Sequence, residues 1–448
     1  MAPPRPAATA IEGAEGVAPA LELLALGSGV VLVAALLGRL PSWRAELGTF
    51  EALFAIGFVF YALALARARR YRGARHGTGI VIAVAAAARL ALLASPPSLS
   101  DDLYRYVWEG RVAAHGLDPY RLAPQAATLA PLRDGAVFPR INHPELATLY
   151  PPLAIAGFAL VAAISPTVLA MKLWVVLHDL ALCLLLVGWL KRRGADPVEA
   201  IAYAWCPLVL VEFAGSGHSD PTAMVWLVAA LMTYRERPLL SAAALTIAAL
   251  TKLVPLLALP FLLRAWPARA RVLALGLLAA GLGAYLWLAR GADSGLAAYA
   301  RSWRHNELAF HYLEAWLADG IRARWAAAVL VALAAGLLLL RGATPEAGGR
   351  LTTRVALLLS PVVHPWYLGW TMALEPLTPS APWVLLSLTC VLSYGVFAPP
   401  AEGAGFHPPL AWRWIEYGAP LALGAVLVWV LRGGSARTHG SDTWRLRT

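Results

Sequence analysis

The stretch "SPPSLSDDLYRYVWEGRVAAHGLDPY", residues 95–120, is a polar interruption in a chain that is otherwise strongly apolar. Of the 448 residues, 59% are hydrophobic and only 14% are charged. Soluble domains carry roughly 25% charged residues, so this composition indicates a membrane protein. The apolar runs approach or exceed the roughly 20 residues that a helix needs to cross a bilayer. They cover residues 21–38, 51–66, 79–95, 167–190, 270–289, 323–340 and 413–431.

The net charge of +11 does not indicate nucleic-acid binding, because the arginines lie in short clusters between apolar runs. Such clusters are typical of cytoplasmic loops of membrane proteins. The three cysteines all lie within apolar runs, which argues against a disulfide framework or a cysteine-based metal site. We predict a disordered tail over residues 1–20, one integral membrane domain over 21–432, and an Arg-rich cytoplasmic tail over 433–448.

The basic clusters also predict the topology. The arginines of residues 67–75 place that loop in the cytoplasm, so residues 96–150 lie outside. The next apolar segment, 151–165, is short for a full crossing. A full crossing would also leave Lys191 and the two arginines after it on the outer side. We therefore expect residues 96–166 to form an outward loop that contains juxtamembrane helices.

The same alternation places residues 214–221, 291–322 and 360–367 outside, and it divides 238–265 into two short helices that meet near Lys252. The fold class is thus an all-α, polytopic transmembrane bundle with about 11–14 membrane helices. Polar residues that are far apart in the sequence are expected to converge on one outward-facing cavity.

The acid pair Asp101–Asp102 opens the polar interruption. Ser100 is a suitable N-cap for a helix that starts at Asp101, and the helix dipole then favours both ionised carboxylates. An ionised, partly enclosed carboxylate can act as a general base or as a ligand of a divalent metal. On spacing alone, another interpretation is equally open: the two acids cap the helix and pair with Arg105.

Lys252 is one of only three lysines, and it lies inside an apolar run. A cation in hydrocarbon costs at least about 2.5 kcal/mol, so it needs an anionic partner or a wet cavity. We expect the side chain to contact a phosphate group, and the alternatives are a structural ion pair or a side chain that snorkels to the membrane surface. Lys172 and Asp179, two helical turns apart, are interpreted as structural polar groups.

Three further motifs fall at the predicted outer face. In "GSGHSDP", His218 and Asp220 fit a proton relay, half of a metal site or a sugar clamp, while the alternative is that Asp220 caps the helix that begins at Pro221. In "RSWRHNE", Arg304 and Asn306 suit either a lipid phosphate or headgroup anchoring. In "HPWY", His364 belongs to a cavity lip or to an aromatic belt.

The motifs "SDDLYRYVWEGRVAAHGLDPY", "HPELATLYPPLA", "EFAGSGHSDP", "LTKLVPLLALP", "RSWRHNELAF" and "SPVVHPWYLGW" together resemble bacterial GT-C fold membrane glycosyltransferases. The resemblance is to glycosyltransferase family 87 and the polyprenol-phosphate-mannose-dependent mannosyltransferases, over roughly residues 80–400. It departs at Glu109, where the family motif has Asp in a "WDG" version. It also leaves two apolar runs before the first helix of the core fold without an assigned role.

The resemblance implies a hexosyltransferase that moves a hexose, typically mannose, from a polyprenyl monophosphate to an acceptor hydroxyl with inversion. Asp101 or Asp102 would be the base, with Asp101 preferred as the first acid of the pair. The implied partners are the lipid donor, a lipid or glycan acceptor and membrane lipids, with no nucleic acid. No cofactor is required by the resemblance, and a divalent metal bound by the paired acids stays open. The implied location is the bacterial inner (plasma) membrane, with the site facing the periplasm. The implied substrate-binding residues are Tyr104, Arg105, Trp108, Arg111, Tyr150, His218, Asp220, Lys252, Arg304, Asn306 and His364.

Two other functions fit parts of the sequence. A transporter or lipid flippase would use Lys172, Asp179 and Lys252 as an intramembrane pathway. A lipid-dependent transferase of the O-antigen polymerase or ligase type would also present arginines on outer loops, but an acid pair at a helix start is less expected there.

Overall fold

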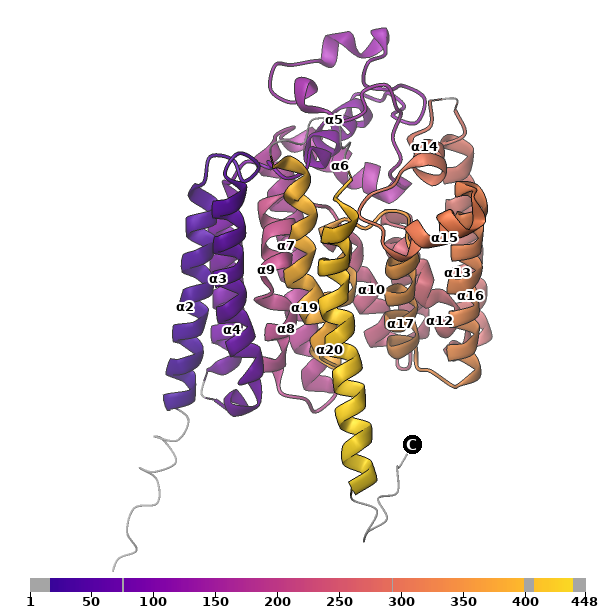
Figure 1. Ribbon diagram of the computed structural model, residues 1–448. Coiled ribbons are helices and arrows are strands. Elements are labelled where there is room, and N and C mark those ends of the chain that lie inside the picture. Colours follow the sequence, from indigo (N-terminus) through magenta and orange to yellow (C-terminus); the bar gives the residue numbers. More distant parts are fainter. Residues whose placement is uncertain (1–16, 75, 292, 399–406, 438–448) are drawn as a thin grey trace, which may run out of the picture.

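The computed structural model describes residues 17–74, 76–291, 293–398 and 407–437, and Figure 1 shows the arrangement of its helices. Within these ranges the chain is a bundle of helices without strands, as predicted, and the only β-type pairing is two isolated bridges. Helix α2 begins at Val17, so the predicted N-terminal tail is shorter by four residues and its remainder lies outside the described residues. Helix α20 runs over Leu410–Arg437, and the rest of the predicted C-terminal tail also lies outside them.

Five helices in the described part are long and apolar enough to cross a membrane: α2 (Val17–Arg39), α3 (Leu47–Ala66), α7 (Val168–Arg192), α13 (Ala268–Leu288) and α16 (Gly320–Leu340). A pair bent by 57°, Pro197–Ala204 with Pro207–Gly215, makes a sixth span if it is counted as one. The shorter apolar helices are α4 (Gly77–Leu93), α6 (Pro152–Ile164), α10 (Pro221–Thr233), α11 (Pro238–Thr251), Val254–Ala265 and Ala381–Phe397. Helix α17 (Pro345–Leu359) completes the wall beside α16.

The two ends of the bundle are built from different segments. Helices α5 (Asp102–Ala114), α6 and α14 (Gly295–Ser302) gather at the end that is uppermost in Figure 1. The basic turns that the sequence places in the cytoplasm lie at the opposite end, where ion pairs link them to one another. Their ion pairs join Arg72 to Glu199 (2.5 Å), Arg193 to Glu346 (3.3 Å) and Arg192 to Glu236 (3.9 Å).

The polar excursion folds over the upper end of the bundle. Helix α5 begins at Asp102, one residue later than predicted, with Asp101 at the N-cap position. Helix α6 has 13 residues, hence a length of about 20 Å, which is shorter than a bilayer core of about 30 Å. Gly110 brings α5 against α6, because a Cβ at this position would lie 2.3 Å from the carbonyl oxygen of Phe158. The predicted short juxtamembrane helix is therefore present.

The chain breaks at Lys252, as the sequence indicates. Helix α11 ends at Thr251, and Lys252 is in extended conformation before the short helix η6 (Val254–Ala258) and α12 (Leu259–Ala265). The break places Lys252 at the end of the bundle that carries α5.

A fully buried ion pair ties the N-terminal helices to the centre of the bundle. Arg89 of α4 donates from Nε to Asp179 Oδ2 of α7 at 2.7 Å, and both side chains have no exposed surface. The Tyr203 hydroxyl donates to the other oxygen of Asp179 at 2.7 Å. Lys172 is held separately by the carbonyl oxygens of Leu92 and Ser95. These contacts make Asp179 and Lys172 structural groups, as interpreted from their spacing.

Replacing Asp179 with Asn is expected to lower the free energy of unfolding by about 3–5 kcal/mol, because the Arg89 guanidinium would stay buried without its counter-charge. The double variant Arg89→Met/Asp179→Leu should recover most of this loss. Thermal melting in detergent measures both. The exposed pair of Arg67 with Glu22 provides the control: Arg67→Ala should change the melting temperature little. Equal melting temperatures for Asp179→Asn and the parent chain would contradict the assignment.

Candidate functional site

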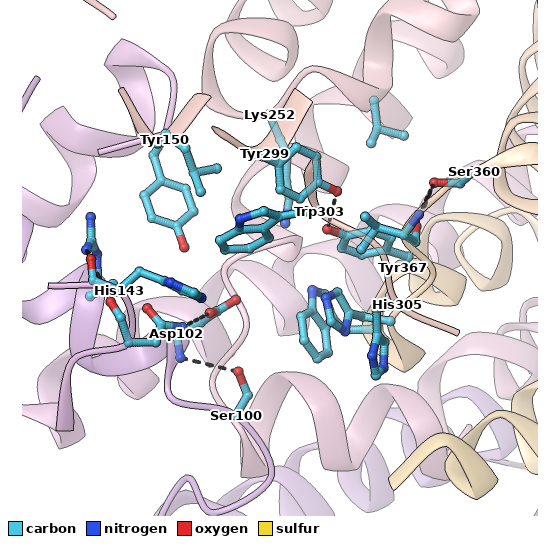
Figure 2. Close-up of a pocket in the computed structure, with 18 of the residues that line it drawn as sticks. Ser100, Asp102, His143, Tyr150, Lys252, Tyr299, Trp303, His305, Ser360 and Tyr367 are labelled. Atoms are coloured by element: carbon cyan, nitrogen blue, oxygen red, sulfur yellow. Dashed lines mark hydrogen bonds between the residues drawn. The ribbon is translucent and has the colours of Figure 1, made fainter. Parts of the chain in front are cut away.

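A cavity of about 820 Å³ opens at the end of the bundle formed by α5, α6 and α14. Figure 2 shows its interior, with Asp102 and Tyr150 on one side, Tyr299 and Trp303 in the middle, and His305 and Tyr367 on the other. Seven of the candidate residues, far apart in the sequence, line this cavity. They are Asp101, Asp102, Arg105, Tyr150, Lys252, Arg304 and His364.

Asp102 is the more enclosed of the two acids, with 24% of its side chain exposed. Its Oδ1 accepts a hydrogen bond from Asn142 Nδ2 at 2.9 Å, and its Oδ2 lies 3.9 Å from His218 Nδ1. Burial raises the pKa of Asp102, while the Asn142 hydrogen bond and the charge of Lys252 lower it. The result is an oriented carboxyl group whose pKa is above its usual range, which suits proton abstraction at neutral pH.

Asp101 is more exposed, at 42% of its side chain, and its nearest cation is Arg44 at 3.7 Å. The predicted pairing of the acids with Arg105 is wrong. Arg105 turns toward Glu109, which its Nη2 contacts at 2.6 Å, and it also donates to the carbonyl oxygens of His143 and Leu146. All three side chains border the cavity, but the guanidinium of Arg105 is bound to Glu109 and to the outer loop and not to the two acids.

Glu109 connects α5 to the outer loop, and we call its contacts with Arg105 and Thr148 the loop anchor. Its Oε1 accepts from Arg105 and its Oε2 accepts from the Thr148 hydroxyl at 2.5 Å. The side chain is only 2% exposed. Glu109 thus fixes α5 to residues 142–148, the segment that carries Asn142 and leads to Tyr150. Glu109 stands where the family motif has Asp, and its additional methylene group lets the carboxylate reach both Arg105 and Thr148.

Lys252 is paired with Asp220, whose Oδ2 lies 2.7 Å from Nζ. The other oxygen of Asp220 accepts from Trp370 Nε1 at 2.7 Å. The alternative that the Asp220 side chain caps the helix beginning at Pro221 is wrong, because the carboxylate makes no cap hydrogen bond. Asp220 is fully buried and holds Lys252 at the cavity wall, so its own part in the site is to position the cation.

Arg304 and Asn306 have different surroundings although they are two residues apart. Arg304 lines the cavity and is paired with Glu307 (2.5 Å) and with Glu314. Asn306 has a positive φ of 53° and points away from the cavity, where its amide donates to the buried carboxylate of Glu416 on α20. Asn306 therefore joins the loop to the C-terminal helix.

An aromatic stack forms one wall of the cavity. Four rings stack in a row. The distance between ring centroids is 3.6 Å for His218 and Trp366, 4.2 Å for Trp366 and His364, and 4.4 Å for His364 and His305. The hydroxyls of Tyr299 and Tyr367 share a hydrogen bond of 2.8 Å, which Figure 2 shows beside Trp303. Aromatic faces with polar edges are the lining that sugar rings and lipid headgroups meet in proteins. His364 lines the cavity.

Three candidate substrate contacts on α5 lie away from the cavity. Trp108 is buried against Phe138, and Arg111 pairs with Asp134 at 2.6 Å, so both stabilise the outer loop. Tyr104 packs its ring under Arg140. Because helical spacing sends every third or fourth side chain to the same face, one helix cannot present all of its aromatic and basic residues to one ligand.

Sequence reasoning missed several residues of the site. Asn142, Tyr299, Trp303, Tyr367 and Arg44 all line the cavity. Asn142 lies in a loop without regular structure, and no motif distinguishes it. Trp303 and Tyr367 lie within the motifs "RSWRHNE" and "HPWY", and Tyr299 lies two residues before the first of these, so the enrichment of Trp and Tyr in the outer segments is the signal that points to them.

Within the described ranges, no group of three or more His, Cys, Asp or Glu side chains is placed to hold a metal ion. An enclosed carboxyl over an aromatic cavity, at the end of a polytopic helical bundle, is the arrangement expected of a GT-C-type membrane glycosyltransferase.

The comparison with protein families names the class more closely. A family model described as "Alpha-(1->6)-mannopyranosyltransferase, N-terminal domain" (the MptA_B family) matches residues 14–269, which is more than half of the chain. The chain belongs to this family, and it is an integral membrane mannosyltransferase. No curated protein and no solved structure matches the chain.

Shortening the loop anchor by Glu109→Asp is expected to cost about 1.5–3 kcal/mol, because the carboxylate can no longer reach both Arg105 and Thr148. The melting temperature should fall, and limited proteolysis should cut within residues 115–150 more quickly. Arg121→Ala is the control, because its ion pair with Asp118 is exposed. Unchanged proteolysis of Glu109→Asp would show that other contacts hold the loop.

Proposed function

We propose that this protein transfers a mannosyl group from a polyprenyl-phosphate donor to an acceptor hydroxyl, with inversion, on the outer face of a bacterial plasma membrane. The observation that carries the proposal is the oriented, half-enclosed Asp102 carboxyl in a cavity whose lining is both aromatic and aliphatic. The mannosyl group and the membrane location follow from the family and the helices. The donor, the stereochemistry, the base and the side of the membrane are the proposed parts.

The lining beside Lys252 supports a lipid-linked donor. The residues after the helix break are apolar, and Leu253, Val254 and Leu257 line the cavity next to the ammonium group. Ala356 and Leu357 of α17 line it as well. A cation followed by an aliphatic surface fits a phosphate attached to a polyprenyl chain better than it fits a free sugar nucleotide.

The reaction needs one base and one stabilised leaving group. Asp102 removes the proton of the acceptor hydroxyl while the acceptor oxygen attacks the anomeric carbon. The bond between that carbon and the phosphate oxygen breaks, and polyprenyl phosphate leaves with the bonding electrons. Lys252 and Arg304 lie where they stabilise the charge that develops on the leaving phosphate. A single displacement of this kind inverts the anomeric carbon.

The geometry favours Asp102 over Asp101, the acid preferred from the resemblance. A base works best when its carboxylate is oriented and partly desolvated, and only Asp102 has the side-chain hydrogen bond from Asn142. Asp101, beside Arg44 and more exposed, is better placed to keep that arginine at the cavity mouth.

The outward orientation is supported by the distribution of charge. The basic turns joined by the pairs of Arg72, Arg192 and Arg193 lie at one end of the bundle, and the cavity lies at the other. Positive charge is retained on the cytoplasmic side of membrane proteins. The cavity would then open toward the periplasm, where lipid-linked sugars can enter from the outer leaflet.

The transporter alternative has less support. Its pathway would need Lys172 and Asp179 to face a shared polar route with Lys252. Instead, Lys172 is bound by the backbone after α4, and Asp179 is enclosed by Arg89 and Tyr203. These partners leave the two groups no role in moving a solute.

Asp102→Asn is expected to reduce mannosyl transfer by about 10²–10⁴-fold, because the amide cannot accept the proton. Asp101→Asn is expected to lose less than about tenfold. Purified protein in detergent with radiolabelled polyprenyl-phosphate mannose and membrane acceptor lipids measures both rates. Full activity of Asp102→Asn, with loss in Asp101→Asn, would transfer the role to Asp101. Full activity of the double variant would rule out the acid pair.

Lys252→Met is expected to lower kcat/KM for the lipid donor by about tenfold or more, because the leaving phosphate loses its cation. The double variant Lys252→Met/Asp220→Asn separates this loss from the burial of an unpaired carboxylate, and it should melt close to the parent chain. Donor titrations of the two variants provide the measurement. A double variant with the parent kcat/KM would remove Lys252 from the donor site.

A further inference from the structure

Behind Asp102, three buried polar side chains form a line that the transfer reaction as proposed does not use. The Tyr394 hydroxyl donates to Glu212 Oε1 at 2.7 Å. Glu212 Oε2 lies 3.5 Å from Nε2 of His218, and His218 Nδ1 lies 3.9 Å from Oδ2 of Asp102. Glu212 is fully buried and His218 is 1% exposed. Among the residues that the structure describes, both ring nitrogens of His218 and Glu212 Oε2 have no formed hydrogen bond.

The backbone that carries these groups is built for close approach. Glu212 lies in a turn of π-helix, Leu210–Gly215, and its carbonyl oxygen accepts from the His218 N–H at 3.0 Å. Single π turns within helices occur frequently at functional sites. Gly217 has a φ of +81°, and a Cβ there would lie 2.9 Å from the Leu103 side chain on α5. The chain thus turns sharply enough to bring His218 under the start of α5.

The His218 ring is also fixed in its plane. It stacks on Trp366 with an interplanar angle of 15°. A stacked ring can slide within its plane but cannot tilt, so its two nitrogens stay aimed at Asp102 and Glu212. Hydrogen bonds of catalytic groups are often long in unliganded enzymes and tighten in the substrate complex.

The burial of Glu212 and His218 indicates which of their atoms carry a proton. A carboxyl group without exposed surface and without a contacting cation is most stable in its neutral form. Tyr394 already donates to Glu212 Oε1, so the acid proton is on Oε2 and points to His218 Nε2. With Nε2 accepting, the neutral imidazole carries its proton on Nδ1, and this proton points to Asp102.

From this geometry we propose that Tyr394, Glu212 and His218 form a chain of neutral donors that positions the Asp102 carboxylate and stabilises its ionised form. Each member donates toward the next, and the last hydrogen bond is made to the base. His218 and Glu212 are thus positioning residues, since only Asp102 contacts the acceptor. The proposal deepens the proposed function and rests on Asp102 as the base.

Other charged groups face the same residues and contribute a constant background. Asp102 is near Lys252, Arg105 and Asp101. His218 is near His364 across Trp366, and near Lys252. Glu212 is near Asp220. The variants described next leave all of these groups unchanged. A shift of the acidic limb of kcat/KM in these variants can therefore be attributed to the donor chain.

The sign of the expected effect follows from the hydrogen bond. A donor to the carboxylate favours the ionised form, so its loss raises the pKa of Asp102. The acidic limb of kcat/KM for mannosyl transfer should then move to higher pH. A hydrogen bond to a charged group corresponds to a shift of about one pH unit or more. Activity at the alkaline plateau should change much less than activity at low pH.

The experiment is a pH profile of kcat/KM for the full-length chain in detergent, with radiolabelled polyprenyl-phosphate mannose. His218→Phe keeps the stacked ring and removes both nitrogens, and Glu212→Leu removes the donor to Nε2. Both are expected to shift the acidic limb upward by about one pH unit. Glu212→Gln is the matched variant: its amide can accept from Tyr394 and donate to Nε2, so its acidic limb should stay within a few tenths of the parent value. Tyr234→Phe, the loss of one tyrosine hydroxyl at the basic end of the bundle, is the control and should leave the limb in place.

Each outcome supports or overturns either the donor chain or the proposed function. Parent-like acidic limbs in both His218→Phe and Glu212→Leu would overturn the donor chain, and so would a Glu212→Gln limb displaced as far as that of Glu212→Leu. If His218→Phe does not fold, Tyr394→Phe, which loses a single hydroxyl, must show a smaller upward shift for the proposal to stand. Asp102→Asn separates the two levels: activity retained in this variant defeats the proposed function, whereas an inactive Asp102→Asn with unshifted chain variants defeats the donor chain alone.

Discussion

Most of the buried charges described above meet a counter-charge, and this constraint organises the structure from the core to the cavity. In the bundle, the buried Arg89–Asp179 pair joins α4 to α7 and is completed by the Tyr203 hydroxyl. In the outer loop, the same requirement pairs Arg105 with Glu109. Removing either partner would strand a charge at low dielectric, so these pairs fix the relative positions of the segments that carry them.

The cavity follows the same rule with one difference. Two of its cations are held by acids that do not line the cavity: Lys252 by Asp220, and Arg304 by Glu307 and Glu314. Such pairing keeps the cations in place before the phosphate of the proposed donor arrives, so little reorganisation would be needed during the proposed reaction. Asp102 is the exception, since its supports are the neutral Asn142 and, as we propose, His218. A carboxylate stabilised by neutral donors keeps more basicity than one paired with an arginine, which is what a base requires.

Much of the fold was accessible from the pattern of charge and hydropathy. The basic clusters predicted the alternation of loops, the short helix after Tyr150 and the break at Lys252, because insertion in a membrane is governed by local composition. The site was predicted less completely. Asp102, Lys252 and His364 came from polar residues in unusual places, whereas Asn142 and Tyr299 come from stretches without a distinguishing pattern. The expected pairing of Arg105 with Asp101 is wrong because Asp101 and Glu109 each lie four residues from Arg105 along the helix, and spacing alone does not choose between them.

The sequence by itself determined that this chain is a polytopic helical membrane protein, that its polar segments collect at one end, and that an acid pair opens the first of them. Its motifs also placed it with the mannosyltransferases, and the match over residues 14–269 agrees. Only the tertiary structure distinguished the surroundings of Asp102 from those of Asp101, placed Trp108 and Arg111 away from the cavity, and brought Glu212 and Tyr394 behind Asp102. The physical reason is that hydropathy is a property of each segment, whereas hydrogen bonds and burial belong to pairs of residues that the folded bundle brings together.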